Sequence, residues 1–208
     1  MVVVGRSRDK TLTVAREVGA ADHGERTVTD AGFEETFQIN YLAPYLLTNL
    51  LMEPLLASGA TVIQTSSNAA RLSAHLDLDD IDNARRYAPV RAYGNAKLAL
   101  VLFTQELHRR YHDRGLSAVA CHPGGVSSNF AQAGRSSVGM VFRSPLPRLF
   151  FQSPHKAARQ LTWLATASDP ERGWESSGYY ERLKLRAVKA PPTGRQLWDR
   201  SAELVGLG

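Results

Sequence analysis

The sequence predicts an α/β fold built around a sheet of short buried strands. Mostly apolar or β-branched runs that indicate strands occupy residues 2–4, 60–65 and 117–121 of the 208-residue chain. Amphipathic helical segments separate them, which favours parallel pairing. Each run ends in a polar or glycine-containing loop, at the sheet edge where open α/β proteins bind ligands. We therefore predict a single domain over residues 1–208 with its site at that edge.

The turn between the first strand and the first helix places Arg6 and Ser7 at this edge of the sheet. Val2–Val4 runs into Gly5-Arg6-Ser7, and residues 9–19 then keep helical spacing up to the stop at Gly19. An arginine at the end of such a strand can hold a ribose 2′-phosphate. The alternative is that the arginine is a solvated surface residue.

The next helix is predicted over residues 30–57, capped by Thr29-Asp30. Its spacing puts Asn40 on a buried face, where the amide needs a partner. Pro44 lacks the N–H that would bond the Asn40 carbonyl, so a kink should free that oxygen to hold a water. In the alternative interpretation, Asn40 only stabilises the kink.

A buried strand over residues 60–65 then leads to the hydroxyls of Ser66 and Ser67. Residues 72–88 read as a solvated surface loop with a short helical piece. A long helix over residues 92–114 follows and carries Tyr93 and Lys97, four residues apart. This spacing sets the phenol beside the ammonium, which would lower the phenol pKa and suit it to proton transfer. The alternative is a packed tyrosine with a solvated lysine.

The strand at residues 117–121 leads into His122-Pro123-Gly124-Gly125-Val126, and residues 127–152 form an irregular apolar segment. We interpret that segment as a lid over a lipophilic pocket, or alternatively as an oligomer or membrane-surface contact. A helix over residues 154–167 and a short edge strand over residues 177–180 complete the pattern.

Composition excludes several functional classes. The net charge of +5 comes from scattered arginines, so no nucleic-acid partner is indicated. The single cysteine, Cys121, lies in an apolar run and suits a reducing compartment. No run has the length of a membrane span or a signal peptide, and we expect a soluble cytoplasmic protein. His108 and His112 fit a helix-end contact better than a metal site, so no metal is expected.

Four ordered motifs carry a family resemblance: "FQINYLAPYLLT", "TVIQTSSNAA", "AYGNAKLALVLFTQEL" and "CHPGGV". With the tail motifs "SSGYY" and "QLWDRS", residues 24–206 resemble the short-chain dehydrogenase/reductase family, in particular its retinol-dehydrogenase-like members. Residues 1–19 are similar to the second strand and helix of that family. The resemblance implies a Rossmann-like, doubly wound parallel sheet in three layers.

The resemblance also implies roles for individual residues. Tyr93 would be the general acid/base, and Lys97 would lower its pKa and hold the nicotinamide ribose. Ser67, which stands two residues before Ala69, would bind the substrate oxygen in preference to Ser66. Asn40 would hold a relay water. The remaining cofactor-binding residues implied are Arg6, Ser7, Pro123, Gly124, Val126 and Ser128.

The implied activity is hydride transfer between a nicotinamide and a small lipophilic alcohol or carbonyl substrate, with a possible homo-oligomer as the working form. Arg6 would select NADP over NAD. Ala96 stands where the family commonly has a serine.

The N-terminal half departs from the family pattern. No glycine-rich phosphate-binding turn precedes Val2, and the third and fourth strands are missing between about Ala20 and Gly24. The fold is therefore expected to be incomplete, with bare strand edges. Either the protein is a complete enzyme and some of its residues are missing from this sequence, or the chain is a truncated product that has lost cofactor binding. The second case predicts a non-catalytic binding or scaffold protein that retains the fold.

Overall fold

The computed structural model describes residues 25–124, 154–166 and 173–207. Several predicted features lie outside these ranges: the strand at residues 2–4, the helix at residues 9–19, the junction at residues 20–24 and the apolar segment 127–152. The cofactor-binding residues predicted outside them are Arg6, Ser7, Val126 and Ser128.

The predicted parallel sheet is confirmed. Its strand order is β1-β2-β3-β4, with the first three strands parallel and β4 antiparallel to β3. The strand bounds are Thr61–Thr65 for β1, Ser117–His122 for β2, Tyr179–Glu181 for β3 and Lys184–Leu185 for β4. The strand predicted at residues 177–180 is β3, but it is not an edge strand, because β4 pairs along its outer side.

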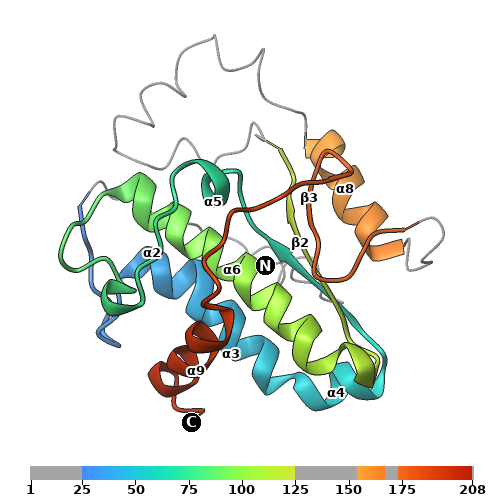
Figure 1. Cartoon of the computed structure of the whole chain (residues 1–208), viewed down its shortest axis with the longest axis horizontal. Coiled ribbons are helices and arrows are strands. Elements are labelled where there is room, and N and C mark those ends of the chain that lie inside the picture. The colour runs from blue at the N-terminus through green and yellow to red at the C-terminus, as the bar shows by residue number, and fades with distance from the viewer. Residues whose placement is uncertain (1–24, 125–153, 167–172, 208) are drawn as a thin grey trace, which may run out of the picture.

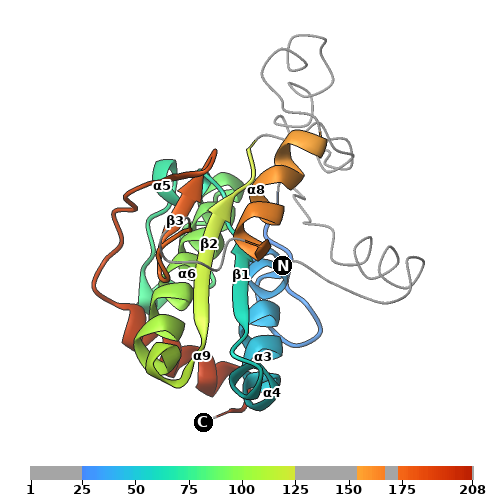
Figure 2. The same ribbon diagram turned by 90° about the vertical axis from the view of Figure 1, so that its right-hand side faces the viewer.

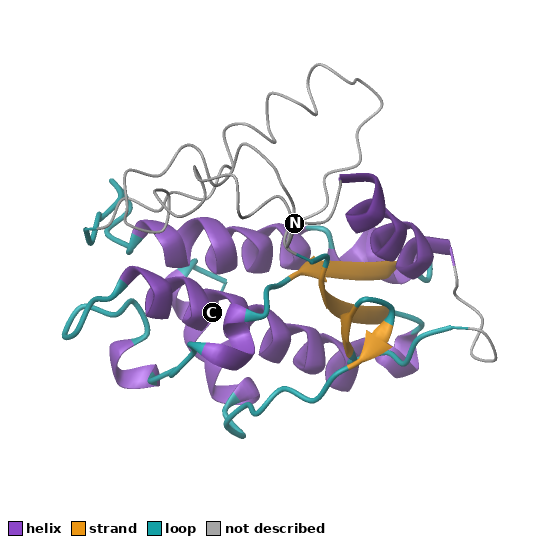
Figure 3. Cartoon of the chain, turned by 90° about the horizontal axis from the view of Figure 1, so that it is seen from above, coloured by secondary structure: helices purple, strands orange, loops and turns teal. Residues whose placement is uncertain are grey.

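Helices cover both faces of the sheet (Figures 1, 2 and 3). Alternate residues of β2 separate the faces: Ala118 and Ala120 join the main core beside α6, whereas Val119 and Cys121 join a smaller cluster beside α8. The helix bounds are α2 Glu35–Phe37, η1 Gln38–Leu42, α3 Ala43–Leu50, α4 Met52–Ala57, α5 Ala69–Leu72, η2 Leu78–Asp80, α6 Pro89–Tyr111, η3 His112–Arg114, α8 Pro154–Thr166 and α9 Gly194–Leu204.

The helix predicted from residue 30 begins later than expected. Residues 29–33 instead form a turn, with Gly32 at φ 83°, and Val28 pairs with Glu34 in a β-bridge. The buried Glu34 carboxylate caps α2 by accepting from the N–H groups of Thr36 and Phe37. The predicted Thr29-Asp30 cap is therefore wrong, because a carboxylate four residues later takes the N-terminal amides.

The predicted disturbance before Pro44 takes the form of a π-helix. In η1, the Ala43 N–H bonds to the Gln38 carbonyl, one residue farther back than in an α-helix. Pro44 has no N–H to offer Asn40, and a widened turn accommodates that missing α-helical bond. Asn40 lies at the centre of η1 and is buried.

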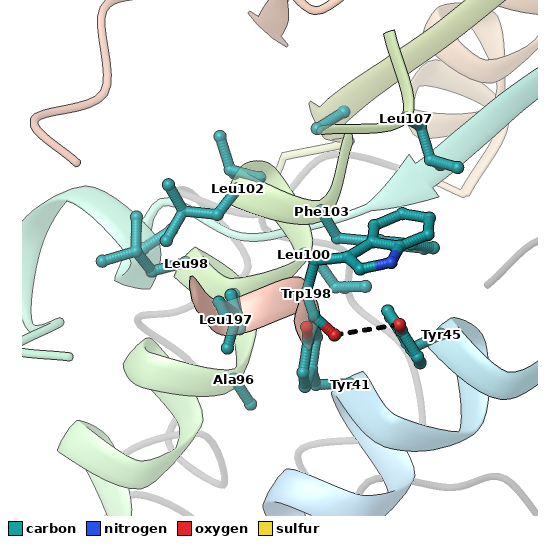
Figure 4. Close-up of a cluster of buried hydrophobic side chains, with 14 of the residues drawn as sticks. Tyr41, Tyr45, Ala96, Leu98, Leu100, Leu102, Phe103, Leu107, Leu197 and Trp198 are labelled. Atoms are coloured by element: carbon teal, nitrogen blue, oxygen red, sulfur yellow. Dashed lines mark hydrogen bonds between the residues drawn. The ribbon is translucent and has the colours of Figure 1, made fainter. Parts of the chain in front are cut away.

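The main core joins α6 to η1, α3 and the C-terminal helix α9 (Figure 4). The Tyr45 hydroxyl donates to the Trp198 carbonyl oxygen at 3.0 Å, and Tyr41 and Ser201 share a hydroxyl–hydroxyl hydrogen bond of 2.8 Å. The Trp198 ring lies 5.5 Å from that of Phe103 on α6. These contacts hold α6, which carries Tyr93 and Lys97, against η1 and α3.

The segment at residues 72–88 is more anchored than predicted. It contains the expected short helical piece, η2, but Ile81 and Asn83 are buried, and Leu76 and Leu78 pack against the main core. Its charges are only partly solvated, since Asp82 pairs with Arg26 at 2.5 Å. The apolar positions within an otherwise charged segment explain the difference.

Within the described residues, no helix is long and apolar enough to cross a membrane. The same residues hold no group of three or more side chains arranged to bind a metal. His108 and His112 stack at the end of α6 with ring centroids 4.4 Å apart. Nδ1 of His108 is hydrogen-bonded to Ser176.

Candidate functional site

The candidate site lies at the carboxyl ends of β1 and β2, where two adjacent serines take different roles. The Ser66 N–H donates to the Cys121 carbonyl oxygen at 2.8 Å, and its hydroxyl donates to the Lys97 carbonyl oxygen at 2.8 Å. Both bonds are buried and join β1 to β2 and to α6. Ser66 is thereby occupied as a structural residue.

Ser67 lies beside Tyr93. A hydrogen bond joins the two side chains, and the Ser67 side chain is only 7% exposed. Its oxygen also accepts a hydrogen bond from the Ala69 N–H at 3.3 Å, at the start of α5. Of the two adjacent serines, Ser67 is thus the one that lies beside Tyr93.

The environment of Tyr93 differs from expectation in its electrostatics. Burial raises the pKa of Tyr93, and the hydrogen bond from Ser67 opposes that rise only in part. The sequence predicted that Lys97 lowers the pKa of Tyr93. That prediction is wrong, because the pKa of Tyr93 is raised overall. The Lys97 Nζ lies over the Tyr93 ring, 5.5 Å from its centroid.

Lys97 is a buried cation and not the solvated residue of the alternative interpretation. Its side chain is 7% exposed, and Nζ donates to the Thr65 carbonyl oxygen at 3.1 Å. Burial lowers the pKa of Lys97 to about 8. A buried ammonium favours binding of a ligand that brings several oxygen acceptors close to it.

Asn40 is held on the helix beside this group. Its Nδ2 donates to the Thr36 carbonyl oxygen at 3.0 Å, and only 8% of the residue is exposed. The buried amide has the definite partner that the sequence predicted. Asn40 lies on η1, which packs against α6, the helix that carries Tyr93 and Lys97.

Pro123 and Gly124 directly follow β2 and are partly exposed. Gly124 has φ 99°, a conformation that favours glycine. The neighbouring strand ends are tied together by Gln160 of α8, whose Nε2 donates to the carbonyl oxygens of His122 and Tyr180. Sequence reasoning missed Gln160, although a buried polar residue in an amphipathic helix indicates a specific partner.

Two further residues were missed inside the Tyr93–Lys97 stretch itself. Gly94 lets the segment after Ser67 approach α6 closely, and Asn95 binds the segment at residues 75–83. The sequence feature that could have indicated the role of Asn95 is an amide on the buried face of an apolar helix.

Comparisons with known proteins place this geometry in a family. A family model described as short chain dehydrogenase matches residues 15–138, which is more than half of the chain. The chain belongs to the short-chain dehydrogenase family. Retinol dehydrogenase 13 of Homo sapiens is 38% identical over 190 residues, covering 86% of this chain and 56% of that protein.

Polyprenol dehydrogenase of Homo sapiens is 32% identical over 200 residues, again covering 86% of this chain and 56% of the relative. The chain therefore spans about half the length of these curated relatives. Among solved structures, an uncharacterised protein from Mycobacterium paratuberculosis matches with a TM-score of 0.62 at 24% identity. That match covers 94% of this chain and 72% of the other, and it shows a shared fold.

Short-chain dehydrogenases use a nicotinamide cofactor, and the described residues fit its nicotinamide half. The buried Lys97 ammonium donates one of its three protons to the Thr65 carbonyl oxygen. An ammonium has further N–H donors that suit ribose hydroxyls. The Gly124 turn exposes backbone at the adjoining strand end. Arg6, Ser7, Val126 and Ser128, predicted to hold other parts of the cofactor, lie outside the described residues.

Proposed function

We propose that this short-chain dehydrogenase transfers a hydride between NADP and a lipophilic alcohol or carbonyl substrate. The observation that carries the proposal is the grouping of Ser67, Tyr93 and Lys97 at the carboxyl end of β1, with Ser67 and Lys97 buried and Tyr93 partly exposed. Three polar side chains converge there on one sheet edge, the position at which open α/β folds bind ligands.

The residues have distinct roles in carbonyl reduction. When bound, the cofactor supplies the hydride that reaches the carbonyl carbon. Tyr93 donates its phenolic proton to the carbonyl oxygen, and Ser67 donates a hydrogen bond to that oxygen. The raised pKa keeps Tyr93 protonated at neutral pH, as an acid must be. Lys97 binds the ribose beside the phenol, and Asn40 holds the water that returns a proton to Tyr93.

The names of two relatives support the substrate class. Retinol dehydrogenase 13 and polyprenol dehydrogenase are both named for apolar alcohols, and each is more than 30% identical to this chain. The apolar composition of residues 127–152 is consistent with a lipophilic substrate.

The first test is turnover of NADPH with a lipophilic aldehyde. The intact protein should show aldehyde-dependent loss of nicotinamide absorbance, and Tyr93→Phe should reduce kcat by at least about 100-fold because it removes the transferred proton. Tyr111→Phe, on the same helix but packed against Trp198, is the matched control and should keep its activity. Unchanged activity of Tyr93→Phe would refute the acid/base role.

The cofactor preference is tested by calorimetric titration. Arg6→Ala should weaken binding of NADP more than binding of NAD, because the guanidinium is proposed to hold the 2′-phosphate that only NADP carries. Equal losses for both cofactors would contradict this selection. Absence of any NADP binding by the folded protein would instead favour the non-catalytic scaffold function.

A further inference from the structure

The chain on both sides of Ser67 is bonded to α6. On the N-terminal side, the Ser66 hydroxyl donates to the Lys97 carbonyl oxygen. The Ser73 hydroxyl lies 3.1 Å from the Ala69 carbonyl oxygen of α5 and 3.3 Å from the Val90 carbonyl oxygen of α6, so its single proton lies between the two helices. Ser67 stands between these two attachments, so its position depends on how closely the following chain lies against α6.

Gly94 sets how closely the two segments approach. A Cβ at this position would lie 2.6 Å from the Ser73 Oγ and 3.1 Å from both the Ala69 carbonyl oxygen and the Ala74 nitrogen. Backbone atoms of α5 and of Ala74, two residues after its end, thus approach α6 where a side chain would otherwise stand. Tyr93, the residue before Gly94, faces Ser67.

Asn95 makes the polar part of this contact. Its Oδ1 accepts from the His75 N–H at 2.6 Å, and its Nδ2 donates to the Asn83 Oδ1 at 2.8 Å. Asn95 and Asn83 are 2% and 3% exposed, so the hydrogen bond between them is shielded from water, whereas the bond from the His75 N–H is partly buried. One amide on the catalytic helix therefore joins both ends of the segment 75–83 that follows α5.

We infer that Asn95 is a positioning residue, which keeps the Ser67 hydroxyl on the Tyr93 hydroxyl by fastening residues 75–83 to α6. Asn95 does not act on the substrate itself. Two residues along a helix from Tyr93, it projects about 200° away from that side chain. The kinetic test of this inference depends on the proposed function. The spectroscopic test depends only on the fold.

The kinetic test is a double-mutant cycle between Asn95→Ala and Ser67→Ala. Asn95→Ala should lower kcat on the order of 10-fold with a smaller change in KM, because the reacting groups are misaligned. In the Ser67→Ala background the same change should have no further effect, because Asn95 acts through Ser67. Equal factors in the two backgrounds would overturn the inference.

The spectroscopic test needs neither cofactor nor turnover. With ¹³C-labelled tyrosine, and Tyr93 assigned by Tyr93→Phe, the Tyr93 pKa should rise in both Asn95→Ala and Ser67→Ala, because each variant should lose the Ser67 hydrogen bond. A Tyr93 titration unchanged by Asn95→Ala would overturn the inference. An inactive wild-type protein would refute the proposed function and leave this titration as the deciding measurement.

A second variant and a control separate positioning from general destabilisation. Asn83→Gly breaks the same contact from the other side, at a residue whose φ of 56° suits glycine, and should reproduce the effects of Asn95→Ala. Ser201→Ala removes a buried hydrogen bond to Tyr41, remote from Ser67, and should leave kcat and the Tyr93 titration unchanged. Matching shifts in Ser201→Ala would overturn the inference.

Discussion

Tyr93 and Lys97 show how helix spacing sets proximity without setting electrostatics. The four-residue spacing brings the two side chains together, as expected, because residues i and i+4 share a helix face. The Lys97 ammonium nevertheless lies over the ring and bonds to the Thr65 carbonyl oxygen. Burial then dominates both groups, raising the pKa of Tyr93 and lowering that of Lys97.

The lowered pKa of Lys97 predicts a pH-dependent stability. Its pKa falls from 10.5 to about 8 on folding, so between these values the unfolded chain binds a proton that the folded chain has lost. Stability therefore rises with pH across this window, by at most about 1.4 kcal/mol per pH unit. Urea unfolding of the wild type between pH 8 and 9.5 should show this rise.

Lys97→Met supplies the comparison for this measurement. It keeps a long side chain without a titrating group, so its free energy of unfolding should lack the rise between pH 8 and 9.5. The raised pKa of Cys121, about 11 against an ordinary 9.0, works in the opposite direction in both proteins, because the unfolded thiol ionises first. Above pH 10 the raised pKa of Tyr45, about 12, adds to that opposition for the same reason. Parallel pH curves for the two proteins below pH 9.5 would show that Lys97 is not a buried cation.

At the level of elements, the contact between α5 and α6 places Ser67. Gly94→Ala should destabilise the fold by about 1–3 kcal/mol, because the new methyl group meets backbone atoms that cannot rotate away. Activity should fall further than the loss of folded protein explains, since Ser67 precedes α5. Urea unfolding combined with kcat measurement tests both effects.

Gly194→Ala is the matched control for this substitution. Gly194 begins α9, and a Cβ there would lie 3.8 Å from the nearest atom, an ordinary contact. The change should be neutral or stabilising by up to about 1 kcal/mol, because alanine favours helix. If both alanine variants destabilise the protein equally, the close approach at Gly94 has no special role.

For the whole molecule, α9 closes the core under the helices that carry the site. Trp198 contacts Tyr45 and Phe103, with ring centroids 5.2 and 5.5 Å away, and is 8% exposed. Trp198→Ala should therefore lower the free energy of unfolding by about 3–5 kcal/mol. Urea unfolding followed by circular dichroism measures the loss.

Leu50→Ala provides the comparison on the outer surface of α3. Leu50 is 65% exposed, so its truncation should change stability by no more than about 0.5 kcal/mol. A loss in Trp198→Ala as small as that in Leu50→Ala would mean that α9 is not part of the cooperative core.

Local patterns in the sequence determined much of this protein. Apolar runs bounded by turns predicted β1 and β2 nearly to the residue, since buried strands need such runs. The pairing of Tyr93 with Lys97 and the disturbed helix before Pro44 also followed from local rules, because both depend on groups within one turn of helix. The helix start at Glu35 did not follow, because several residues before it could have capped it.

Only the tertiary structure decided how these pieces meet. Ser67 reaches Tyr93 because β1 and α6 pack together, and Asn95 binds Asn83 across a segment that the sequence presents as a charged loop. The direction of each pKa shift depends on burial, which is summed over residues distant in sequence. The sequence by itself thus determined which side chains stand at the site, and packing determined their contacts and charge states.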